Sequence, residues 1–420
     1  MLIYDFLFII LFLSALPFLC LRRKLHRGYW QRLGFIRESR RFENSIWIHA
    51  VSVGEIISAK ELIKSLKQEF PQRSLLISTI TPTGNKIART IATSNDAVIY
   101  LPLDISFIIR RFIKIFDPSI FISLESEFWP NLYIQLSHAN IPKVILNGRI
   151  SASAFNKYHI FKLFIKPILR RVDFFTMQTK EYQDRLMQLG VGEEKIEISG
   201  NMKFDVQSLR GQSPDIEKIR ADLRLNPADV LFVCGCTHKD EEEIVLSVYK
   251  KLAKSFENLR LFIAPRHVER VKEIEKIVSN LDFRPVRISQ LKDEKITATS
   301  VYLLDIIGRL KDYYAASSIC FVGGSLVASG GHNILEPAAF SKPIIFGKYM
   351  YNFSDIRDLF LKAEAAIEVE NESELYLALS QLLKNSHKAK NLGLNAKMIV
   401  DNNKGATARN VRIIKRFLKN

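Results

Sequence analysis

Cysteine is scarce in this chain, and two common nucleotide-binding signatures are missing. Only Cys20, Cys234, Cys236 and Cys320 occur among 420 residues, which is too few and too scattered for a disulfide framework, so we expect a reducing compartment. No glycine loop ends in Lys-Ser or Lys-Thr, and no early GxGxxG precedes an acidic residue. These absences argue against a P-loop nucleotidase and against an ordinary dinucleotide-binding domain.

Acidic residues are in the minority, with 44 Asp and Glu against 61 Lys and Arg and a net charge of +17. Such a charge attracts anionic lipids, phosphorylated substrates or nucleic acid. The basic residues are spread through the chain without zinc-finger spacing, an RNP-like aromatic motif or a basic zipper, so we predict no nucleic-acid partner. Cys234, Cys236 and His238 lie close together, but no further Cys or His follows at zinc-like spacing, so we predict no metal site.

Charge is nearly absent from residues 1–21, where Asp5 is the one charged side chain. At about 1.5 Å per residue, a helix of this length is long enough to cross the apolar core of a bilayer. The residues that follow form a basic run, which places the body of the protein in the cytoplasm: Arg22, Arg23, Lys24, His26 and Arg27. No small-residue cleavage site is evident, so we predict an uncleaved membrane anchor. Pro17 and Asp5 leave open an insertion into one leaflet instead of a full span.

A length of 420 residues exceeds one ordinary core and predicts two domains. Short β-rich apolar runs alternate with segments of helical periodicity, which predicts an α/β protein with parallel sheets. The predicted strands are Ile46–His49, Ser74–Thr79, Ala97–Leu101, Ile120–Leu124, Lys143–Asn147, Phe174–Gln178, Val230–Cys234, Arg260–Ala264, Val301–Leu304, Ile319–Val322 and Pro343–Phe346. Periodicity lapses at Val206–Pro214, so we place the domain boundary there. We expect two doubly wound domains that face each other across a cleft.

Polar residues that directly follow predicted strands are the first candidates for a site, because ligands bind beyond the carboxyl ends of such strands. Glu55 follows the first strand and is a candidate general base, although an acid in a first helical turn also stabilises the helix dipole. Glu125 and Glu127 follow the fourth predicted strand, beside a Trp. Lys203 follows a Gly-Asn step and suits either a phosphate or a catalytic carboxylate.

The second half supplies cationic and glycine-rich candidates. Arg266 and His267 directly follow a predicted strand and suit a phosphate. The segment Ile319–Ala339 contains two glycine pairs before a helix start, which predicts a phosphate site formed by loop amides. Asn333 and Glu336 share one helix face, so Glu336 is placed to accept hydrogen bonds from a ribose diol. A capped tight turn is the plain structural alternative.

Several motifs together resemble the lipid A Kdo transferase family, the 3-deoxy-D-manno-octulosonic acid (Kdo) transferases of the Gram-negative envelope. These motifs span nearly the whole chain in the expected order. They are WIHAVSVGE at 47–55, STITPTG at 78–84, LESEFWPNL at 124–132, NGRIS at 147–151, GNMKFD at 200–205, APRH at 264–267 and GGHNILEPA at 330–338.

The resemblance implies a GT-B glycosyltransferase fold with two Rossmann-like domains. It implies inverting transfer of Kdo from CMP-Kdo to a lipid A precursor (lipid IVA), with no metal and no other cofactor. The implied parts are a membrane anchor (1–21), an N-terminal acceptor-binding domain (36–206), a C-terminal nucleotide-sugar-binding domain (215–405) and a C-terminal helix (406–420) that returns to the N-terminal domain. The family also implies an inner-membrane protein whose catalytic body lies on the cytoplasmic face, against anionic lipids.

Roles for individual residues follow from the same resemblance. Glu55 matches the catalytic base, and Glu125 and Lys203 match residues that stabilise the transition state. The matches to CMP contacts are Pro265, Arg266, Asn333, Ile334, Leu335 and Glu336. A further CMP contact, usually Met-Gly-Glu-Leu-like, falls on DIIGRL, so its positions are Ile307, Gly308 and Arg309. Gly308 preserves a backbone contact, whereas Arg309 reverses the usual charge.

Two other functions remain open from the residues alone. One is a GT-B transferase that uses a UDP- or ADP-sugar donor. The other is a non-catalytic basic membrane protein that binds lipid or nucleic acid. Turnover of CMP-Kdo, compared with turnover of those other donors, separates the three.

Overall fold

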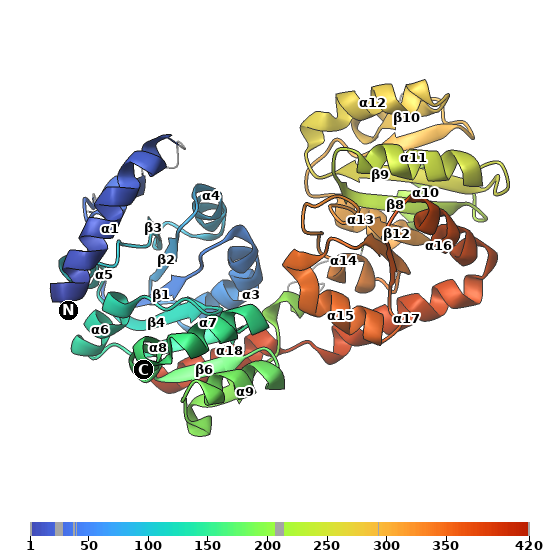
Figure 1. Ribbon diagram of the computed structural model, residues 1–420. Helices are drawn as coiled ribbons and strands as arrows, with labels where there is room; N and C mark the ends of the chain where they lie inside the picture. The colour runs from blue at the N-terminus through green and yellow to red at the C-terminus, as the bar shows by residue number, and fades with distance from the viewer. Residues whose placement is uncertain are drawn as a thin grey trace. The chain divides into compact units, whose positions relative to one another are not determined.

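The computed structural model describes residues 2–21, 28–36, 38, 40–205, 214–292 and 294–418. The basic run at 22–27 and most of the predicted domain boundary, 206–213, lie outside the described residues. The chain divides into two compact units (Figure 1). Unit 1 comprises Met1–Val206 and Asn403–Asn420, and unit 2 comprises Gln207–Asn402.

Unit 1 is built on a parallel sheet of seven strands in the order β3-β2-β1-β4-β5-β6-β7. These strands are β1 Ser45–His49, β2 Leu75–Thr79, β3 Ala97–Tyr100, β4 Pro118–Leu124, β5 Lys143–Gly148, β6 Phe174–Met177 and β7 Ile196–Ile198. Strand β1 pairs with β2 on one side and with β4 on the other. The chain therefore winds outward from β1 in both directions, and the boundary between β1 and β4 is the topological switch point of a doubly wound sheet.

Helices cover both faces of this sheet because alternate strand residues point to opposite sides. One face carries Trp47, Phe121 and Ile145; against it pack α1 Leu2–Leu21, α5 Ser106–Phe116, α6 Pro130–His138, α7 Ala152–Ile160, α8 Lys162–Leu169 and α9 Lys180–Gln188. Leu33 and Ile36, which follow α2 Gly28–Arg32, pack against the same face. The other face carries Ile48 and Ile122; it is covered by α3 Val53–Glu69, α4 Pro82–Ile91 and α18 Ala406–Phe417.

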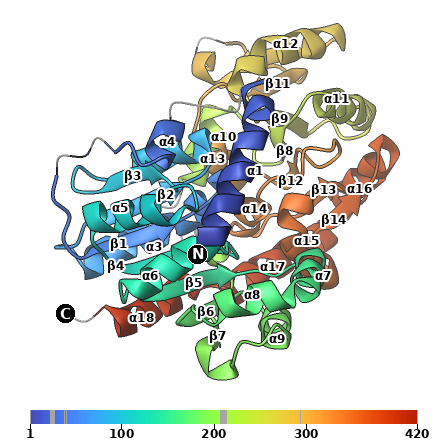
Figure 2. The ribbon, with the colours of Figure 1, turned by 60° about the vertical axis from the view of Figure 1, so that its left-hand side comes forward.

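Unit 2 repeats the doubly wound plan with a sheet in the order β10-β11-β9-β8-β12-β13-β14. Figure 2 shows this order from β11 to β14. Its described strands are β8 Val230–Thr237, β9 Leu259–Pro265, β10 Arg284–Arg287, β11 Ser300–Leu303, β12 Ile319–Val322, β13 Ile344–Gly347 and β14 Ile367–Val369. Strand β8 pairs in parallel with β9 on one side and with β12 on the other. The switch point of this sheet therefore lies between β8 and β12.

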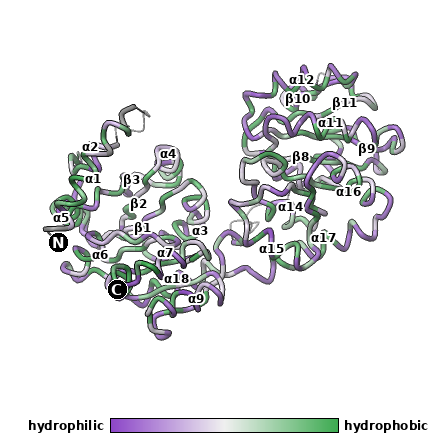
Figure 3. The backbone as a smooth tube through the Cα atoms, viewed as in Figure 1, coloured by the Kyte–Doolittle hydropathy of each residue, from purple (hydrophilic) through white to green (hydrophobic). Residues whose placement is uncertain are grey.

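The helices of unit 2 also lie on two faces of its sheet. On one face Phe232, Ile263 and Phe321 pack against α11 Glu241–Leu252, α12 Val271–Asn280, α16 Glu372–Lys384 and α17 Ser386–Asn402. On the other, Val233 and Phe262 pack against α10 Ile216–Asp222 and α13 Leu310–Ala316. The remaining described α-helices are α14 Leu335–Ala338 and α15 Ser354–Lys362. In Figure 3 the central strands of each unit lie among the hydrophobic parts of the trace. The predicted α/β class with two doubly wound sheets is confirmed.

Helix α1 is attached to unit 1 by polar contacts in its first turn. The hydroxyl of Tyr4 donates to Oδ2 of Asp104 at 2.9 Å. Oδ1 of Asp5 accepts from the backbone N–H of Ser106, the first residue of α5, at 2.9 Å and from Nδ2 of Asn131 in α6 at 2.7 Å. Figure 1 shows α1 beside these two helices. The one charge of the predicted anchor thus caps a helix of unit 1.

The rest of α1 presents one face to the protein and leaves another exposed. Phe8, Ile9 and Phe12 pack against the core of unit 1, at the spacing of one helix face. The exposed large apolar side chains of α1 are Phe6, Leu7, Ile10, Leu11, Leu13 and Phe18. Within the described part of the chain, no helix is apolar and long enough to span a membrane.

The last helix, α18, belongs to unit 1 although it follows unit 2 in the chain. The carboxylate of Asp205 accepts hydrogen bonds from the backbone N–H groups of Gly405 and Thr407 and so stabilises the start of α18. Nε of Arg409 donates to the carbonyl of Ser199 at 2.7 Å. These contacts fix α18 beside the loop that carries Lys203.

Candidate active site

The switch point of the unit 1 sheet brings together the first two acidic candidates. Glu55 lies in the first turn of α3, directly after β1, and Glu125 is the first residue after β4. Because β1 and β4 are hydrogen-bonded neighbours, their following loops leave the same edge of the sheet side by side. The structure therefore places Glu55 and Glu125 where ligands bind in doubly wound sheets.

Both carboxylate oxygens of Glu55 are held by its own loop. Oε2 accepts from the backbone N–H of Val51 at 2.8 Å, and Oε1 accepts from the hydroxyl of Ser52 at 2.9 Å. Ser52 is also the N-cap of α3, and its Oγ accepts from the backbone N–H of Glu55. This reciprocal capping fixes the side-chain conformation of Glu55, and each oxygen has a second lone pair for a further donor.

The surroundings of Glu55 favour its protonated form. Burial raises the pKa of Glu55 to about 7, and the charge of Glu125 and, more weakly, that of Glu127 act in the same direction. The hydrogen bonds from Val51 and Ser52 oppose the rise. A carboxyl group whose pKa lies near neutrality exchanges protons readily at physiological pH, which suits a general base.

The loop after β4 holds its acids in a strained backbone. Glu125 has a φ of +58°, and its backbone N–H donates to the carbonyl of Leu146 at 2.9 Å. A non-glycine residue in the left-handed region costs about 1–3 kcal/mol, and such strain is concentrated at functional sites. Burial, and then the charge of Glu125, raise the pKa of Glu127. The two acids predicted from sequence thus lie in one loop, next to Glu55.

Lys203 lies in the short 3₁₀ helix Met202–Phe204, on a loop fixed by amide side chains. Oδ1 of Asn147 accepts from the backbone N–H of Met202 at 2.9 Å. Nδ2 of Asn201 donates to Oε1 of Gln178 at 3.0 Å, and Oδ1 of Asn201 accepts from the backbone N–H of Lys203 at 2.9 Å. Asn147 lies near the end of β5 and Gln178 directly follows β6 in the same sheet, so this network attaches the Lys203 loop to the edge that carries the acids.

In unit 2 the first glycine pair does not offer its amides to a phosphate. The buried carboxylate of Glu241 accepts hydrogen bonds from the backbone N–H groups of Gly324, Ser325 and Leu326 at 2.7–2.9 Å. It also accepts one from the backbone N–H of His238 at 2.9 Å. The sequence predicted that these loop amides hold a ligand phosphate; that prediction is wrong for these three, because an internal carboxylate already occupies their anion-binding position.

Arg266 remains a candidate anion contact. It follows Pro265 at the end of β9, its backbone N–H donates to the carbonyl of Thr237 at 2.9 Å, and its side chain is exposed. Neighbouring Cys236 has a φ of +56°. Burial, and then the charge of Glu336, raise the pKa of the Cys236 thiol to about 12, whereas Arg266 opposes that rise. The structure thus brings Arg266 and Glu336 into one neighbourhood at the β8–β9–β12 edge.

The Asn333–Glu336 segment forms the start of the one-turn helix α14. Oδ1 of Asn333 accepts from the backbone N–H of Leu335 at 3.1 Å, and Nδ2 of Asn333 lies 3.5 Å from Oε1 of Glu336. Burial raises the pKa of Glu336. The side chains of Ile334 and Leu335 are buried. The predicted pairing of Asn333 with Glu336 on one face is present.

The predicted contact at Ile307–Arg309 lies in the loop after β11. Gly308 has a φ of +87°, and a Cβ atom at this position would meet no neighbouring heavy atom within 4 Å. The side chain of Ile307 is exposed. The guanidinium of Arg309 pairs with Asp312 in α13. The loop leaves the same sheet edge as the loop of Arg266, because β11 pairs with β9, but the side chain of Arg309 is directed to its own helix.

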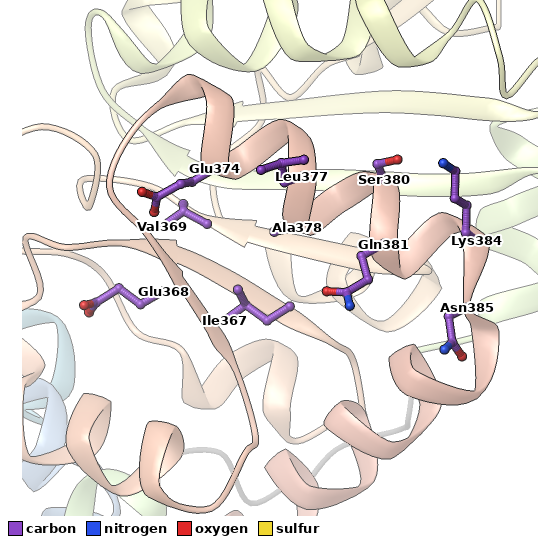
Figure 4. Close-up of a pocket in the computed structure, with 10 residues that line it drawn as sticks. All are labelled: Ile367, Glu368, Val369, Glu374, Leu377, Ala378, Ser380, Gln381, Lys384 and Asn385. Atoms are coloured by element: carbon purple, nitrogen blue, oxygen red, sulfur yellow. The ribbon is translucent and has the colours of Figure 1, made fainter.

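Two further contacts at this edge were not predicted from the sequence. His238 and His332 are in hydrogen-bond contact, and Glu241 joins their two loops. In the described residues no three His, Cys, Asp or Glu side chains are arranged to hold a metal ion. A pocket of about 570 Å³ opens elsewhere in unit 2, between β14 and α16, and is lined by residues such as Glu368, Glu374 and Gln381 (Figure 4). None of the candidate residues lines it.

Comparison with known proteins decides the family. The protein-family model described as 3-deoxy-D-manno-octulosonic-acid transferase (kdotransferase) matches residues 27–206. A 3-deoxy-D-manno-octulosonic acid transferase of Haemophilus influenzae is 36% identical over 379 residues, which cover 89% of this chain and 87% of that protein. The chain belongs to this family. The transferase of the same description from Aquifex aeolicus is 30% identical over 341 residues, 81% of this chain and 86% of that protein.

The same family membership makes the chain a glycosyltransferase, and its two doubly wound sheets are those of the GT-B fold. The chain superposes on a co-structure of S. aureus MnaA with UDP with a TM-score of 0.57 and 14% identity. The match covers 89% of this chain and 96% of the MnaA chain. At that identity the likeness shows the shared fold alone. The predicted family and enzyme class are thus confirmed, whereas the roles of single residues in this Kdo transferase family member stay predictions.

Proposed function

We propose that this transferase moves Kdo from CMP-Kdo to a lipid A precursor with inversion at the anomeric carbon. Its family supports the transferred sugar. The observation that carries the mechanism is Glu55, a carboxyl group fixed at the switch point of the sheet with a pKa raised to about 7.

In the proposed reaction Glu55 accepts the proton of the acceptor hydroxyl as its oxygen forms a bond to the anomeric carbon of Kdo. The bond from that carbon to the CMP phosphate oxygen breaks, and its electron pair leaves with CMP. The free lone pair on each oxygen of Glu55 is the proton acceptor, while Val51 and Ser52 hold the group in place. General base assistance of this kind contributes about 10²–10⁴-fold to the rate.

We assign Glu125 and Lys203 to the transition state, in which positive charge grows on the anomeric carbon and negative charge grows on the leaving phosphate. Pro265, Arg266, Asn333, Ile334, Leu335 and Glu336 are assigned to CMP. The exposed guanidinium of Arg266 suits the phosphate, and the carboxylate of Glu336 suits the ribose hydroxyls. For Ile307, Gly308 and Arg309 we propose a backbone contact at Gly308. CMP is a leaving group already activated for transfer, so the proposed reaction takes no cofactor.

We propose that unit 1 binds the cytoplasmic face of the inner membrane through two apolar surfaces. One is the exposed face of α1 described above. The other, here called the α7–α8 surface, consists of the exposed side chains of Ile160, Phe161, Leu163 and Phe164. Residues 152–171 around it contain five Lys or Arg and no acidic residue. Both surfaces lie on the helical layer that covers one face of the sheet, and the basic flank favours anionic lipid.

Transfer by the purified protein tests this function. The protein is incubated with lipid A precursor and CMP-Kdo, and in parallel with a UDP-sugar or an ADP-sugar, and the lipid is analysed by mass spectrometry. We expect a gain in mass equal to one or more Kdo residues with CMP-Kdo, undiminished by a chelator of divalent cations. A gain with another donor and none with CMP-Kdo overturns the proposed donor.

A further inference from the structure

Two histidines that lie 94 positions apart in the chain form a hydrogen-bonded pair in unit 2. Nε2 of His238, in the loop after β8, is 2.9 Å from Nε2 of His332, in the loop after β12. The two rings are nearly parallel, with an interplanar angle of 17° and centroids 5.1 Å apart. Because β8 and β12 flank the switch point of the unit 2 sheet, the pair lies where a doubly wound sheet binds its ligand.

The loops are shaped around this pair. Gly324 has a φ of +66°, and a Cβ atom at this position would lie 2.9 Å from Cδ2 of His332 and 3.3 Å from Cδ2 of His238. The carboxylate of Glu241 binds the backbone N–H groups of both His238 and Gly324. The glycine beneath the rings and the carboxylate that joins their loops fix the two imidazoles relative to each other.

The geometry sets the number of protons between the two facing ring nitrogens. A 2.9 Å contact between two ring nitrogens requires that one Nε2 carries a proton and the other does not. The hydroxyl of Ser329 lies 3.4 Å from Nδ1 of His238 and approaches the opposite nitrogen of that ring. Two neutral imidazoles satisfy this contact with one hydrogen bond, and a proton added at the free nitrogen of either ring converts them into a cation that retains it.

Burial, and then cationic neighbours, favour the neutral pair in the absence of an anion. The charged or titratable groups around it are Arg266 and His267 after β9, Glu241 and Glu242 in α11 and Arg270 in the 3₁₀ helix Val268–Arg270. Burial, and then His267, lower the pKa of His238, while Glu242 opposes them. Burial, and then His238 and Arg266, lower the pKa of His332 to about 4. An anion bound beside Arg266 would reverse part of this effect, because it offsets the cationic charge.

We propose that the His238–His332 pair binds the phosphate of the nucleotide donor and takes up one proton from solvent when it does so. This inference rests on the proposed CMP-sugar donor. The uptake breaks no covalent bond: the neutral pair plus one proton becomes a singly charged pair beside the monoanionic phosphodiester. Donor binding then depends on pH in a range where the empty pair is neutral, and the pair loses the proton again when CMP departs.

The probe for this proposal is the methyl ester of CMP. Like the donor, it is a phosphodiester with a single negative charge, whereas CMP itself has a second phosphate pKa near 6 and exchanges protons of its own. Binding to the full chain is measured by titration calorimetry in two buffers of different ionisation enthalpy, from pH 6 to pH 8. We expect uptake of up to about one proton per ligand and an affinity that falls by up to about tenfold for each unit of rising pH.

A matched pair of variants locates the proton. His332→Gln keeps a polar group near Nε2 but removes one of the two imidazoles, so its proton uptake and the pH dependence of its binding should fall well below those of the unmodified protein. His387→Gln, an exposed residue of α17, should behave like the unmodified protein. His238→Gln provides a second test of the pair if His332→Gln does not fold.

Each outcome decides between the pair and the proposed donor. If the methyl ester of CMP binds without proton uptake, the proposed role of the pair is overturned and the proposed donor stands. The same holds if His332→Gln and His238→Gln take up as many protons as the unmodified protein. The methyl ester of UMP is measured in parallel. If it binds and the methyl ester of CMP does not, and if His332→Gln lowers the proton uptake, the pair is supported and the proposed donor is overturned. Binding of neither ester overturns both.

Discussion

The hydroxyl of Ser52 donates a hydrogen bond to Oε1 of Glu55 at 2.9 Å, and the same hydroxyl caps the helix on which Glu55 lies. One side chain thus sets both the position of the proposed base and the proton affinity of its carboxylate. The hydrogen bond stabilises the ionised form and holds the pKa of Glu55 below the value that burial alone would produce.

Ser52→Ala should therefore move the acidic limb of the pH–rate profile to higher pH. The variant loses a bond to the ionised carboxylate, so the pKa of Glu55 rises and a smaller fraction of the enzyme carries the active base at neutral pH. Loss of the N-cap should cost about 1 kcal/mol of stability. The profile of kcat against pH checks this; an acidic limb that stays in place contradicts the assignment of Glu55 as the ionising group.

Glu55→Gln should reduce kcat by roughly 10²–10⁴-fold, because the amide cannot accept the proton of the acceptor hydroxyl. The fold should persist, since the amide oxygen can accept from Val51 and the amide nitrogen can donate to Oγ of Ser52. The pKa of Glu55 is raised in the folded state to about 7. Ionisation of Glu55 therefore destabilises the fold as the pH rises from the ordinary pKa of a glutamate through about 7. Removing the charge should therefore leave stability at pH 8 equal or higher.

Single-turnover transfer and thermal unfolding are measured on the same Glu55→Gln preparation. A helix-capping role alone would predict a small loss of stability with nearly normal turnover. A slow variant with undiminished unfolding temperature supports the base, and a fast one removes Glu55 from the mechanism.

Most of the strands were within reach of the sequence, since the eleven predicted strands are all present. The three strands that were missed, β7, β10 and β14, are edge strands. They read IEI, RPVR and IEV. Because an edge strand is paired on one side and partly exposed, charged residues alternate with its apolar ones and no continuous apolar run marks it.

The site was predictable where a single loop carries it and unpredictable where two loops must meet. Glu55 follows from its place after a strand, whereas Glu241 lies in a run of four acids, Asp240–Glu243, that resembles an exposed first helical turn. The fold buries Glu241 and Glu242 and leaves Glu243 exposed. The contact between His238 and His332 depends on the pairing of β8 with β12, which no local pattern specifies.

Asp5→Ala should loosen α1 from unit 1. The variant removes the acceptor for the first N–H of α5 and for Nδ2 of Asn131, at a cost of about 1–3 kcal/mol. Limited proteolysis should cut within α1 faster, and the unfolding temperature should fall. Ser14→Ala is the control, because the hydroxyl of Ser14 bonds within α1 and is exposed. Equal behaviour of the two variants would mean that Asp5 does not anchor the helix.

Replacing Leu163 and Phe164 by serine should weaken binding to vesicles that contain anionic lipid. These side chains of the α7–α8 surface are 88% and 76% exposed, so their loss should leave the fold intact. Burial of such a side chain contributes about 1.5–3 kcal/mol, so we expect at least about a tenfold loss in a vesicle sedimentation assay. Leu377→Ser, at a 64% exposed position on α16 of unit 2, should change nothing. Undiminished binding of the double variant would exclude this surface.

Glu241→Gln should destabilise unit 2 and weaken donor binding together. The carboxylate accepts hydrogen bonds from four backbone N–H groups. In the amide one oxygen is replaced by an NH₂ group, which is itself a donor and cannot accept from these N–H groups. With hydrogen bonds to a buried charge lost and N–H groups left unpaired, we expect a loss of about 2–4 kcal/mol. Because the same carboxylate fixes the loops of His238 and Gly324, the affinity for the methyl ester of CMP should fall in the fraction that remains folded.

Glu243→Gln, two positions along the same helix and exposed, provides the matched control. Chemical unfolding and calorimetry on both variants decide the matter: if Glu241→Gln is as stable and binds as tightly as Glu243→Gln, the buried carboxylate does not organise the donor loops.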